Sequence, residues 1–316
     1  MQHNAKVSDE EFIRLFRTYG SPKRVAKEIG VDVRKVYERR QRMEEKGVAL
    51  PSFNAPQKIY SGTLVPESRR VIKHGVQDGM VVVASDCHYW PGESTVAHRA
   101  FVEIIKAYKP KTIVLNGDVF DGARTSRHDA LFGAVTPTPK QEIEACQDRL
   151  DEISQAYKSA TRFWLYGNHD IRLWRYIYAN APEIIGMQGT DLMEYFPGWV
   201  HGWRLDVNDS TVIKHRLASG LHAAYNNVLK SGKTMVTGHL HRLCVTPWGD
   251  YNGRRWGVDT GTLAEPDGEQ FRYMEEAPTS GCSGFAVLTF KDGMLLPPEL
   301  CEVINGHAYF RGQEVV

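Results

Sequence analysis

The pattern of hydrophobic and polar positions changes near residue 80. From Met80 onward, short apolar runs alternate with stretches whose apolar residues recur at helical spacing, which is typical of an α/β domain. Buried strands are predicted at 80–85, 112–117, 162–167 and 234–238, with further strands at 202–206 and 210–216. Helices are predicted at 94–108, 139–160, 219–230 and around Trp174. The C-terminal part is mainly β, with a hairpin turn at Asp292-Gly293.

The first 47 residues have helical spacing throughout and no strand pattern. Ser8 opens a capping box at the start of a first helix. Gly30 ends a second helix and Asp32 caps a third, so three short helices are predicted. The following stretch contains three prolines and no sustained period, which indicates a linker. We therefore expect a helical domain at 1–47, a linker at 48–75 and an α/β domain at 76–316.

Composition excludes some classes of protein. The 316 residues carry a formal net charge of +1, so overall charge neither favours nor excludes a nucleic-acid partner. Five cysteines are scattered without a CxxC pair, which is typical of reduced thiols in the cytoplasm. The N-terminus lacks the apolar run of a signal peptide, and no stretch approaches the roughly 18 apolar residues of a membrane helix. We expect a soluble, cytoplasmic protein with no membrane partner.

Four segments with metal-binding side chains each follow a predicted strand. They are Ser85-Asp86-Cys87-His88, Gly117-Asp118-Val119-Phe120-Asp121, Gly167-Asn168-His169-Asp170 and Gly238-His239-Leu240-His241, and His215 stands at a further strand end. Strand ends converge on a crevice in an open α/β sheet, so these side chains can meet. Alternate residues of an extended segment point the same way, which predicts that Asp86 and His88 face one point. The same geometry is expected for His239 and His241.

The order D-x-H, G-D-x-x-D, G-N-H-D, single His and G-H-x-H resembles the calcineurin-like metallophosphoesterases over roughly residues 80–265. Each motif alone is common by chance, but the full ordered set is specific. The resemblance implies a central two-sheet β-sandwich flanked by helices, and a phosphoester hydrolase with two divalent metal ions. It also implies a ligand set: Asp118 as the bridge, Asp86, His88 and His241 on one ion, and Asn168, His215 and His239 on the other.

The resemblance most often points to Mn²⁺, and mixed oxygen and imidazole ligands suit Mn²⁺, Fe or Zn²⁺ better than Mg²⁺ or Ca²⁺. A metal-bridged hydroxide would attack phosphorus. By the same resemblance, His169 is the general acid that protonates the leaving group, and Asp121 orients it. An aspartate at position 121 matches the phosphatase branch of the family, whereas the DNA-repair nuclease branch usually has histidine there. Asp121 therefore leaves the branch open.

One position departs from the family pattern. The single histidine is normally followed by glycine, but Arg216 follows His215. His222 is the alternative ligand. We favour His215 because it ends an apolar strand, whereas His222 falls in a predicted helix.

Several residues beside the motifs are candidates for substrate contacts. Arginine forms bidentate hydrogen bonds with phosphate, which makes a loop with Arg124, Arg127 and His128 a candidate phosphate-binding segment. A solvated charged loop is the alternative. Tyr89 and Trp90 could stack on a base, although packing in the core or at its rim is the simpler interpretation.

The N-terminal helices resemble a helix-turn-helix unit. Ala26 lies where two helices must approach closely, Gly30 at the turn, and Val36 where the third helix meets the core. On this alignment the predicted DNA contacts are Arg34 and Lys35 in the major groove and Arg39 and Arg40 at phosphates. One such unit binds weakly, so tight binding would need a homodimer or help from the catalytic domain. The alternative is a helical cap or an oligomerisation arm with a basic surface.

The leading hypothesis is a metal-dependent phosphodiesterase that acts on nucleic acid, a DNA nuclease delivered by its N-terminal helices. A phosphatase for phosphoproteins or small phosphomonoesters is the alternative that Asp121 favours. A third hypothesis is a DNA-binding regulator with a catalytically silent scaffold, which the complete set of expected ligand types disfavours. The combination of a helix-turn-helix arm with this domain also resembles genes carried by bacteriophages, which would place the protein in an infected bacterial host.

Overall fold

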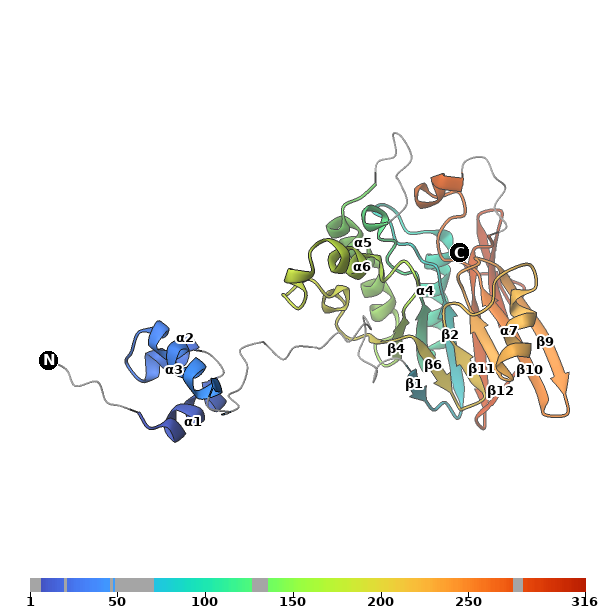
Figure 1. The fold of residues 1–316 in the computed structure, drawn as a ribbon. Helices are drawn as coiled ribbons and strands as arrows, with labels where there is room; N and C mark the ends of the chain where they lie inside the picture. The colour runs from blue at the N-terminus through green and yellow to red at the C-terminus, as the bar shows by residue number, and fades with distance from the viewer. Residues whose placement is uncertain (1–6, 20–21, 46–47, 49–70, 127–135, 275–280) are drawn as a thin grey trace. The chain divides into compact units, whose positions relative to one another are not determined.

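The computed structural model describes residues 7–19, 22–45, 48, 71–126, 136–274 and 281–316. The chain forms two compact units, Met1–Ile59 and Tyr60–Val316, and each has its own hydrophobic core (Figure 1).

The first unit consists of α1 (Asp9–Tyr19), α2 (Pro22–Glu28) and α3 (Val33–Glu45). Ser8 Oγ accepts a hydrogen bond from the backbone N–H of Glu11 at 3.2 Å, so it caps α1. Asp32 Oδ1 accepts one from the backbone N–H of Arg34 at 2.8 Å and caps α3. Gly30 has φ +66°, the left-handed conformation that ends a helix. The buried side chains of this unit are Phe12, Leu15, Phe16, Val25, Ala26, Val36 and Met43.

The second unit contains two sheets. The smaller sheet has six strands in the order β1-β6-β7-β8-β10-β9. Its strands are β1 (Val71–His74), β6 (Arg204–Val207), β7 (Thr211–Ile213), β8 (Thr234–Thr237), β9 (Leu243–Asp250) and β10 (Gly253–Thr260). β7, β8 and β10 are parallel to one another, whereas β6 is antiparallel to β7 and β9 is antiparallel to β10.

The larger sheet has the order β15-β14-β13-β11-β2-β3-β4-β5, and β12 pairs with β11. Its strands are β2 (Gly79–Ala84), β3 (Thr112–Asn116), β4 (Thr161–Leu165), β5 (Val200–Gly202), β11 (Gly284–Lys291), β12 (Met294–Leu295), β13 (Glu299–Ile304), β14 (His307–Phe310) and β15 (Gln313–Glu314). β2 to β5 form a parallel block, and β11 to β15 are antiparallel neighbours. The carboxyl ends of β2, β3 and β4 therefore lie at one edge.

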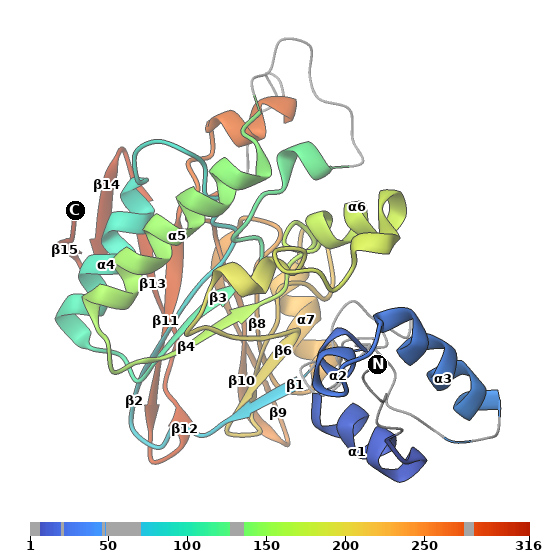
Figure 2. The same cartoon turned by 90° about the vertical axis from the view of Figure 1, so that its left-hand side faces the viewer.

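The two faces of the larger sheet bury different partners. Val81 and Val83 of β2 pack with Val236 of β8, so they fill the space between the sheets. Val82 points the other way and packs in a cluster with Phe101, on α4 (Val96–Tyr108). Figure 2 shows α4 and α5 (Pro139–Ala156) in front of β11 and β13. The smaller sheet packs against α7 (Ala223–Ser231) through β8, β9 and β10. This arrangement confirms the predicted sandwich flanked by helices.

The remaining helices are short. They are α6 (Arg172–Asn180) and the 3-10 helices η2 (Ala123–Thr125), η3 (Pro182–Ile184), η4 (Leu192–Tyr195) and η5 (Glu269–Met274). Among the described residues, no helix combines the length and the apolar character that crossing a bilayer requires.

The stretch predicted as a linker, 48–75, contains a strand at its C-terminal end. Residues 71–74 form β1, which pairs in parallel with β6 and extends the smaller sheet. Residues 49–70 lie outside the described part of the chain. The predicted hairpin turn is confirmed, because Asp292 has φ +50° and Gly293 has φ +76°, the two left-handed residues of a two-residue turn.

Candidate metal centre

Strands from both sheets end where the candidate metal ligands lie. The parallel neighbours β2, β3 and β4 are followed by Asp86, Asp118 and Asn168. In the other sheet, the parallel pair β7 and β8 is followed by His215 and His239. Because parallel strands end at the same edge, loops from the two sheets meet there.

Interatomic distances show how closely these side chains approach. His215 Nε2 lies 3.0 Å from Asp118 Oδ2 and 4.0 Å from Asp86 Oδ1. His241 Nε2 lies 3.2 Å from Asp86 Oδ1, and the rings of His215 and His239 are 5.3 Å apart. Three groups of three have ligand atoms within 4.8 Å of one another: Asp86, His88 and His241; Asp118, His215 and His239; and His88, Asp121 and His169. The first two groups contain six of the seven expected metal ligands, and the seventh is the amide of Asn168.

Four buried polar atoms here lack a hydrogen-bond partner among the described residues: Asp86 Oδ1, His88 Nε2, Asn168 Oδ1 and His215 Nε2. The close contacts of Asp86 and His215 given above do not have hydrogen-bond geometry. Buried polar groups are normally paired, because an unpaired one costs roughly 1–3 kcal/mol. Carboxylate, amide and imidazole atoms left free in one place fit divalent cations of the Mn²⁺, Fe and Zn²⁺ class.

The two aspartates at this site are ionised. Burial alone would raise the pKa of Asp86, but the neighbouring His215 and His241 outweigh it and lower that pKa to about 2. Burial also opposes ionisation of Asp118, and His215 and His169 outweigh it, which holds the pKa of Asp118 well below its usual range. Two ionised carboxylates side by side favour a bound cation.

The backbone of the ligand-bearing loops is left-handed. The φ angles are +51° at Asp86, +40° at His88, +52° at Asp118, +73° at His239 and +56° at His241. The expectation that these pairs meet as alternate residues of extended segments is therefore wrong. A left-handed non-glycine residue costs on the order of 1–3 kcal/mol, so the surrounding fold must hold it. Two inter-loop hydrogen bonds do so, from Asp86 N to Gly117 O and from His88 N to Asp118 O, both at 2.9 Å.

The glycines of the motifs make room for the ligand side chains. A Cβ atom at Gly167 would lie 2.0 Å from Asp118 Oδ1, and one at Gly238 would lie 2.5 Å from Asp86 Oδ2. A Cβ at Gly117, whose φ is +88°, would lie 2.4 Å from His215 Nδ1. These three positions therefore require glycine.

A second set of contacts surrounds His169. Its Nδ1 lies 2.9 Å from Asp121 Oδ1, and the same oxygen lies 2.8 Å from His88 Nδ1. Arg172, at the start of α6, places Nη2 3.0 Å from His169 Nε2 and donates from Nη1 to the carbonyl of Asp121. Burial would lower the pKa of His169, but the carboxylates of Asp118 and Asp121 outweigh it and raise that pKa.

Comparison with known proteins decides the family. Residues 79–256 match the family model of calcineurin-like phosphoesterases. The chain belongs to this family. It is a metal-dependent phosphoesterase that uses divalent metal ions.

Two relatives of this phosphoesterase are phage proteins. The Gene 54 protein of Mycobacterium phage L5 is 27% identical over 252 residues, which cover 72% of this chain and 94% of the relative. The Gene 54 protein of Mycobacterium phage D29 is 28% identical over the same length, with the same coverage. These relatives support the expectation of a phage origin.

Solved structures are similar at lower identity. Vps29 of Entamoeba histolytica, crystallised with Zn²⁺, has a TM-score of 0.40 and 13% identity, over 75% of this chain and 99% of that one. The phosphoesterase Yfce of E. coli has a TM-score of 0.36 and 16% identity, over 69% of this chain and 97% of that one.

Two buried acidic residues of the phosphoesterase were given no role from the sequence. Asp170 accepts hydrogen bonds from the backbone N–H groups of Asp118, Val119, Phe120 and Gly167, at 2.7–3.1 Å. Glu142 of α5 accepts from those of Gly122 and Ala123 at 2.6 and 3.1 Å. Both carboxyls hold the loop between Asp118 and η2. Asp170 belongs to the G-N-H-D motif and could have been found, whereas nothing around Glu142 distinguishes it from other helix residues.

The surroundings of His215 and His222 distinguish these two candidates for the single-histidine metal ligand. The ring of His215 is 2% exposed, and its Nδ1 lies 2.7 Å from the carbonyl oxygen of Asn116. That contact directs Nε2 toward Asp118. His222 is exposed at the start of α7 and belongs to neither group of converging ligand atoms.

Of the three predicted substrate residues, the structure describes Arg124. Arg124 is exposed and donates to the carbonyl of Thr136 at 3.0 Å. Arg127 and His128 lie outside the described residues. Tyr89 is buried and contacts His98 Nδ1 at 2.9 Å, which is the core-packing alternative. Arg172, which the sequence analysis did not single out, is the arginine found beside His169.

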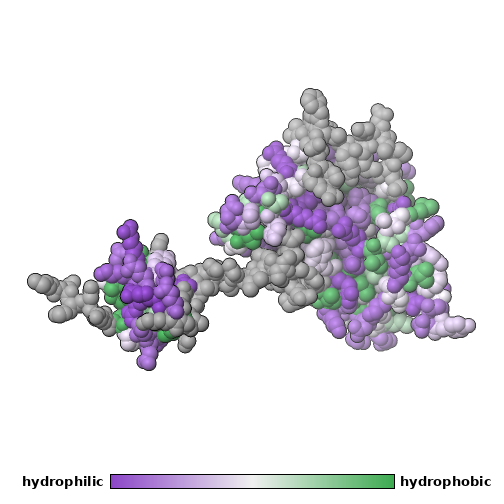
Figure 3. All heavy atoms as spheres, in the orientation of Figure 1, coloured by the Kyte–Doolittle hydropathy of each residue, from purple (hydrophilic) through white to green (hydrophobic). Residues whose placement is uncertain are grey.

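The residues predicted to contact DNA differ in whether their side chains are exposed or contact other residues of the same unit. Arg34 and Lys35 are exposed. Arg39 instead pairs with Asp9 at 2.6 Å, and its guanidinium lies 4.5 Å from the centre of the Phe12 ring. The guanidinium of Arg40 lies 6.0 Å from the centre of the Phe16 ring. The face of this unit turned to the viewer in Figure 3 is largely hydrophilic.

Proposed function

We propose that this phosphoesterase cleaves phosphodiester bonds of nucleic acid, acting as a DNA nuclease with two Mn²⁺ ions. Fe and Zn²⁺ are the other metals that its donor atoms suit. The observation that carries the proposal is the convergence of six side chains in two groups, beside buried ligand atoms without hydrogen bonds that include Asn168 Oδ1. The exposed basic residues of α3 extend the proposal to DNA.

The tautomers of two histidines support the ligand assignment. His88 contacts Asp121 through Nδ1, and His215 contacts the Asn116 carbonyl through Nδ1, so Nε2 of each ring is free to bind metal. One ion would be held by Asp86, His88 and His241, the other by Asn168, His215 and His239, with Asp118 shared between them. When bound, two ions supply Lewis-acid activation of the phosphoryl group and acidify a nucleophilic water.

His169 would donate the proton to the leaving oxygen. Asp121 accepts at Nδ1, which fixes the ring and leaves Nε2 to carry the transferable proton. The raised pKa of His169 favours the protonated form near neutral pH. Protonation at Nε2 removes the acceptor for Arg172, and the guanidinium then becomes available to a phosphate oxygen of the substrate.

The helical unit supports nucleic acid as the substrate. Arg34 and Lys35 lie in the first turn of α3, exposed, with Asp32 fixing the start of that helix. In a helix-turn-helix the same turn of the recognition helix contacts base edges. Arg39 is committed to Asp9 within the unit, so phosphate contact through Arg39 would require breaking that ion pair. DNA binding by this unit would bring phosphodiester bonds to the catalytic unit, as a monomer or a homodimer.

A phosphomonoesterase is the alternative, and the contact between Asp121 and His169 favours it. By the resemblance described in the sequence analysis, aspartate at this position matches the phosphatase branch. A catalytically silent DNA-binding regulator gains no support from the site, because all of the expected ligand residue types are present and gathered.

The type of phosphoester bond that the protein cuts distinguishes a nuclease from a phosphatase. Full-length protein with Mn²⁺ is incubated with linear duplex DNA, single-stranded DNA, a phosphopeptide and bis-p-nitrophenyl phosphate, and each reaction is repeated after chelation with EDTA. We expect cleavage of DNA and of the diester, with none in EDTA. Phosphopeptide hydrolysis with intact DNA would overturn the nuclease proposal in favour of a phosphatase. Retained cleavage in EDTA would contradict the metal mechanism.

A further inference from the structure

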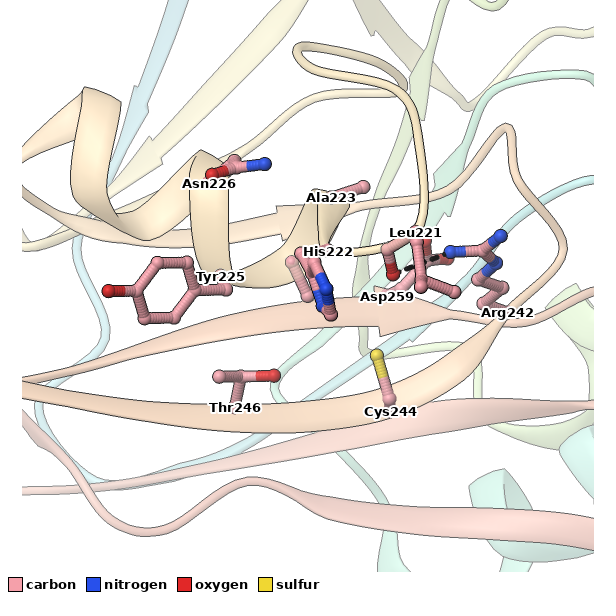
Figure 4. A pocket seen from close by; sticks show the side chains of 10 residues that line it. Leu221, His222, Ala223, Tyr225, Asn226, Arg242, Cys244, Thr246 and Asp259 are labelled. Atoms are coloured by element: carbon pink, nitrogen blue, oxygen red, sulfur yellow. Dashed lines mark hydrogen bonds between the residues drawn. The ribbon is translucent and has the colours of Figure 1, made fainter.

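A cavity of about 480 Å³ lies between the start of α7 and the strands β9 and β10 (Figure 4). Its volume is within the range of small-molecule sites, roughly 300–1,000 Å³. No residue assigned to the metal centre lines it. The polar and aromatic side chains around it include His222, Tyr225, Arg242, Cys244, Thr246 and Asp259.

The buried end of the cavity presents an unpaired acid. Asp259 is 1% exposed, and its Oδ1 has no hydrogen-bond partner among the residues that the structure describes. Burial raises the pKa of Asp259 well above its usual range, and the charge of Asp86 adds to the effect. An unpaired buried acceptor costs roughly 1–3 kcal/mol. A ligand that donates an N–H group to Oδ1 would remove this cost.

The rim of the cavity favours an anion. α7 is nine residues long, and His222 at its N-terminal boundary makes no side-chain capping bond. The backbone N–H groups of an uncapped first turn carry partial positive charge. Arg242 Nη1 donates to the carbonyls of Gly220 and Leu221 at 2.9 and 2.7 Å, which holds a full positive charge at the same rim. Figure 4 shows Arg242 beside Leu221 and the ring of His222 directed toward Cys244.

An aromatic wall completes the site. Tyr225 lines the cavity with 40% of its surface exposed, and its ring meets that of Trp248 edge to face, with centroids 5.4 Å apart. An exposed tyrosine ring held in this way offers a stacking surface to a planar base.

The cavity shares two loops with the metal centre. Arg242 directly follows His241, and the loop that carries Gly220 and Leu221 begins after His215. A group bound in the cavity is therefore anchored by the same loops that carry two candidate metal ligands.

We propose that this cavity binds a nucleotide whose base carries an exocyclic amino group. The amino group donates to Asp259, the base packs on Tyr225, and the phosphate lies at the start of α7 beside Arg242. The choice of a nucleotide rests on the proposed nucleic-acid phosphodiesterase, because nucleotides are the fragments of its substrate. Adenine, cytosine and guanine carry an amino group, whereas the base N–H of thymine, at N3, lies between two carbonyl oxygens that would repel a carboxyl acceptor.

Binding of the four deoxynucleoside monophosphates to the full chain tests the inference by titration calorimetry in EDTA, so that the metal centre contributes nothing. We expect dAMP, dCMP and dGMP to bind at least about ten-fold more tightly than dTMP. Asp259→Leu should lower the affinities for dAMP, dCMP and dGMP to that for dTMP. Asp259→Asn, the conservative variant, should change the order of the affinities for these three nucleotides. Arg242→Ala should weaken all four by a similar factor. Arg254→Ala, on the same hairpin, is the control and should change none.

Two results would overturn the inference. One is an absence of nucleotide binding at millimolar concentration, or equal binding of all four nucleotides by the wild type. The other is zinc binding in the cavity: an Asp118→Asn variant would retain a zinc ion, and adding Cys244→Ser to that variant would remove it. This result would show that the cavity binds a metal. Mn²⁺-dependent DNA cleavage is measured on the same wild-type preparation. Cleavage without nucleotide binding defeats only this inference, whereas nucleotide binding without cleavage defeats the proposed function.

Discussion

One carboxylate oxygen of Asp121 lies 2.9 Å from His169 Nδ1, in a part of the chain 48 residues away in sequence. The contact fixes the imidazole so that Nε2 is the only ring nitrogen left to exchange a proton with a substrate. It also joins the second motif to the third, and the same oxygen contacts His88 of the first motif. The position of one oxygen atom thus couples a proposed proton donor to a proposed metal ligand.

Loss of the proton donor should depend on the leaving group. His169→Ala should lower kcat for DNA by about 10²–10⁴-fold, the range of general acid catalysis. It should lower kcat for bis-p-nitrophenyl phosphate far less, because p-nitrophenolate leaves readily without a proton. His307→Ala, at an exposed histidine paired with Glu314, is the matched control. Equal losses on both substrates would show that His169 is not the acid.

Crowding the bridging carboxylate should abolish activity with a smaller effect on folding. A methyl group at Gly167 would lie 2.0 Å from Asp118 Oδ1, so Gly167→Ala must displace that oxygen. We expect a loss of more than about 100-fold in Mn²⁺-dependent hydrolysis and destabilisation of about 1–3 kcal/mol, typical of overpacking. Gly249→Ala, where a Cβ meets nothing within 4 Å, is the control. The two variants are compared by steady-state kinetics and urea unfolding, and wild-type activity in Gly167→Ala would contradict the proposed bridge.

Glu142 should make stability depend on pH. Burial, with Asp121 adding, raises its pKa from 4.5 to about 8 in the folded protein. The folded state thus binds the proton more tightly, so the stability contributed is fully present below about pH 4.5 and is lost as pH rises through about 8. Glu142→Gln cannot ionise, so its free energy of unfolding relative to wild type should rise by more than about 1 kcal/mol between pH 5 and pH 8.

Urea unfolding of metal-free protein at the two pH values measures this difference. Glu144→Gln, at an exposed position on the same helix, should show no such change. A difference between Glu142→Gln and wild type that stays constant from pH 5 to pH 8 would refute the raised pKa.

Charge on α3 should control the salt dependence of DNA binding. Removing Arg34 and Lys35 together should make the slope of log K against log salt shallower, because two positive charges leave the DNA interface and fewer counterions are released on binding. The double variant Lys140→Ala and Lys230→Ala removes the same charge from the catalytic unit and serves as the control. Fluorescence anisotropy with a duplex at several salt concentrations gives both slopes. An unchanged slope in the α3 variant would locate DNA binding elsewhere.

The site could be predicted from the sequence where metal-binding residues directly follow a predicted strand. Asp86, Asp118, Asn168 and His239 each follow a short apolar run, and parallel strands must end together, so their meeting could be predicted without coordinates. The hairpin at Asp292 could be predicted for a similar local reason, since only a few residue types accept two consecutive left-handed angles.

Features set by tertiary contacts could not be predicted. The left-handed angles at His88 and His241 are imposed by hydrogen bonds between loops, against local preference. β1 is a four-residue edge strand with no fully buried side chain, so it leaves no hydrophobic pattern. Glu142 contacts the loop beside the metal centre only because α5 lies next to η2 in the fold. The local sequence of α5 does not determine that placement.

The central claim is that seven side chains from both sheets hold a pair of metal ions with Asp118 between them. Anomalous diffraction at the manganese edge, from crystals grown with Mn²⁺, tests it most directly. The account predicts two peaks about 3.5–4 Å apart. One should lie among Asp86, His88 and His241, and the other among Asn168, His215 and His239. A single peak, or peaks away from Asp118, would contradict the account.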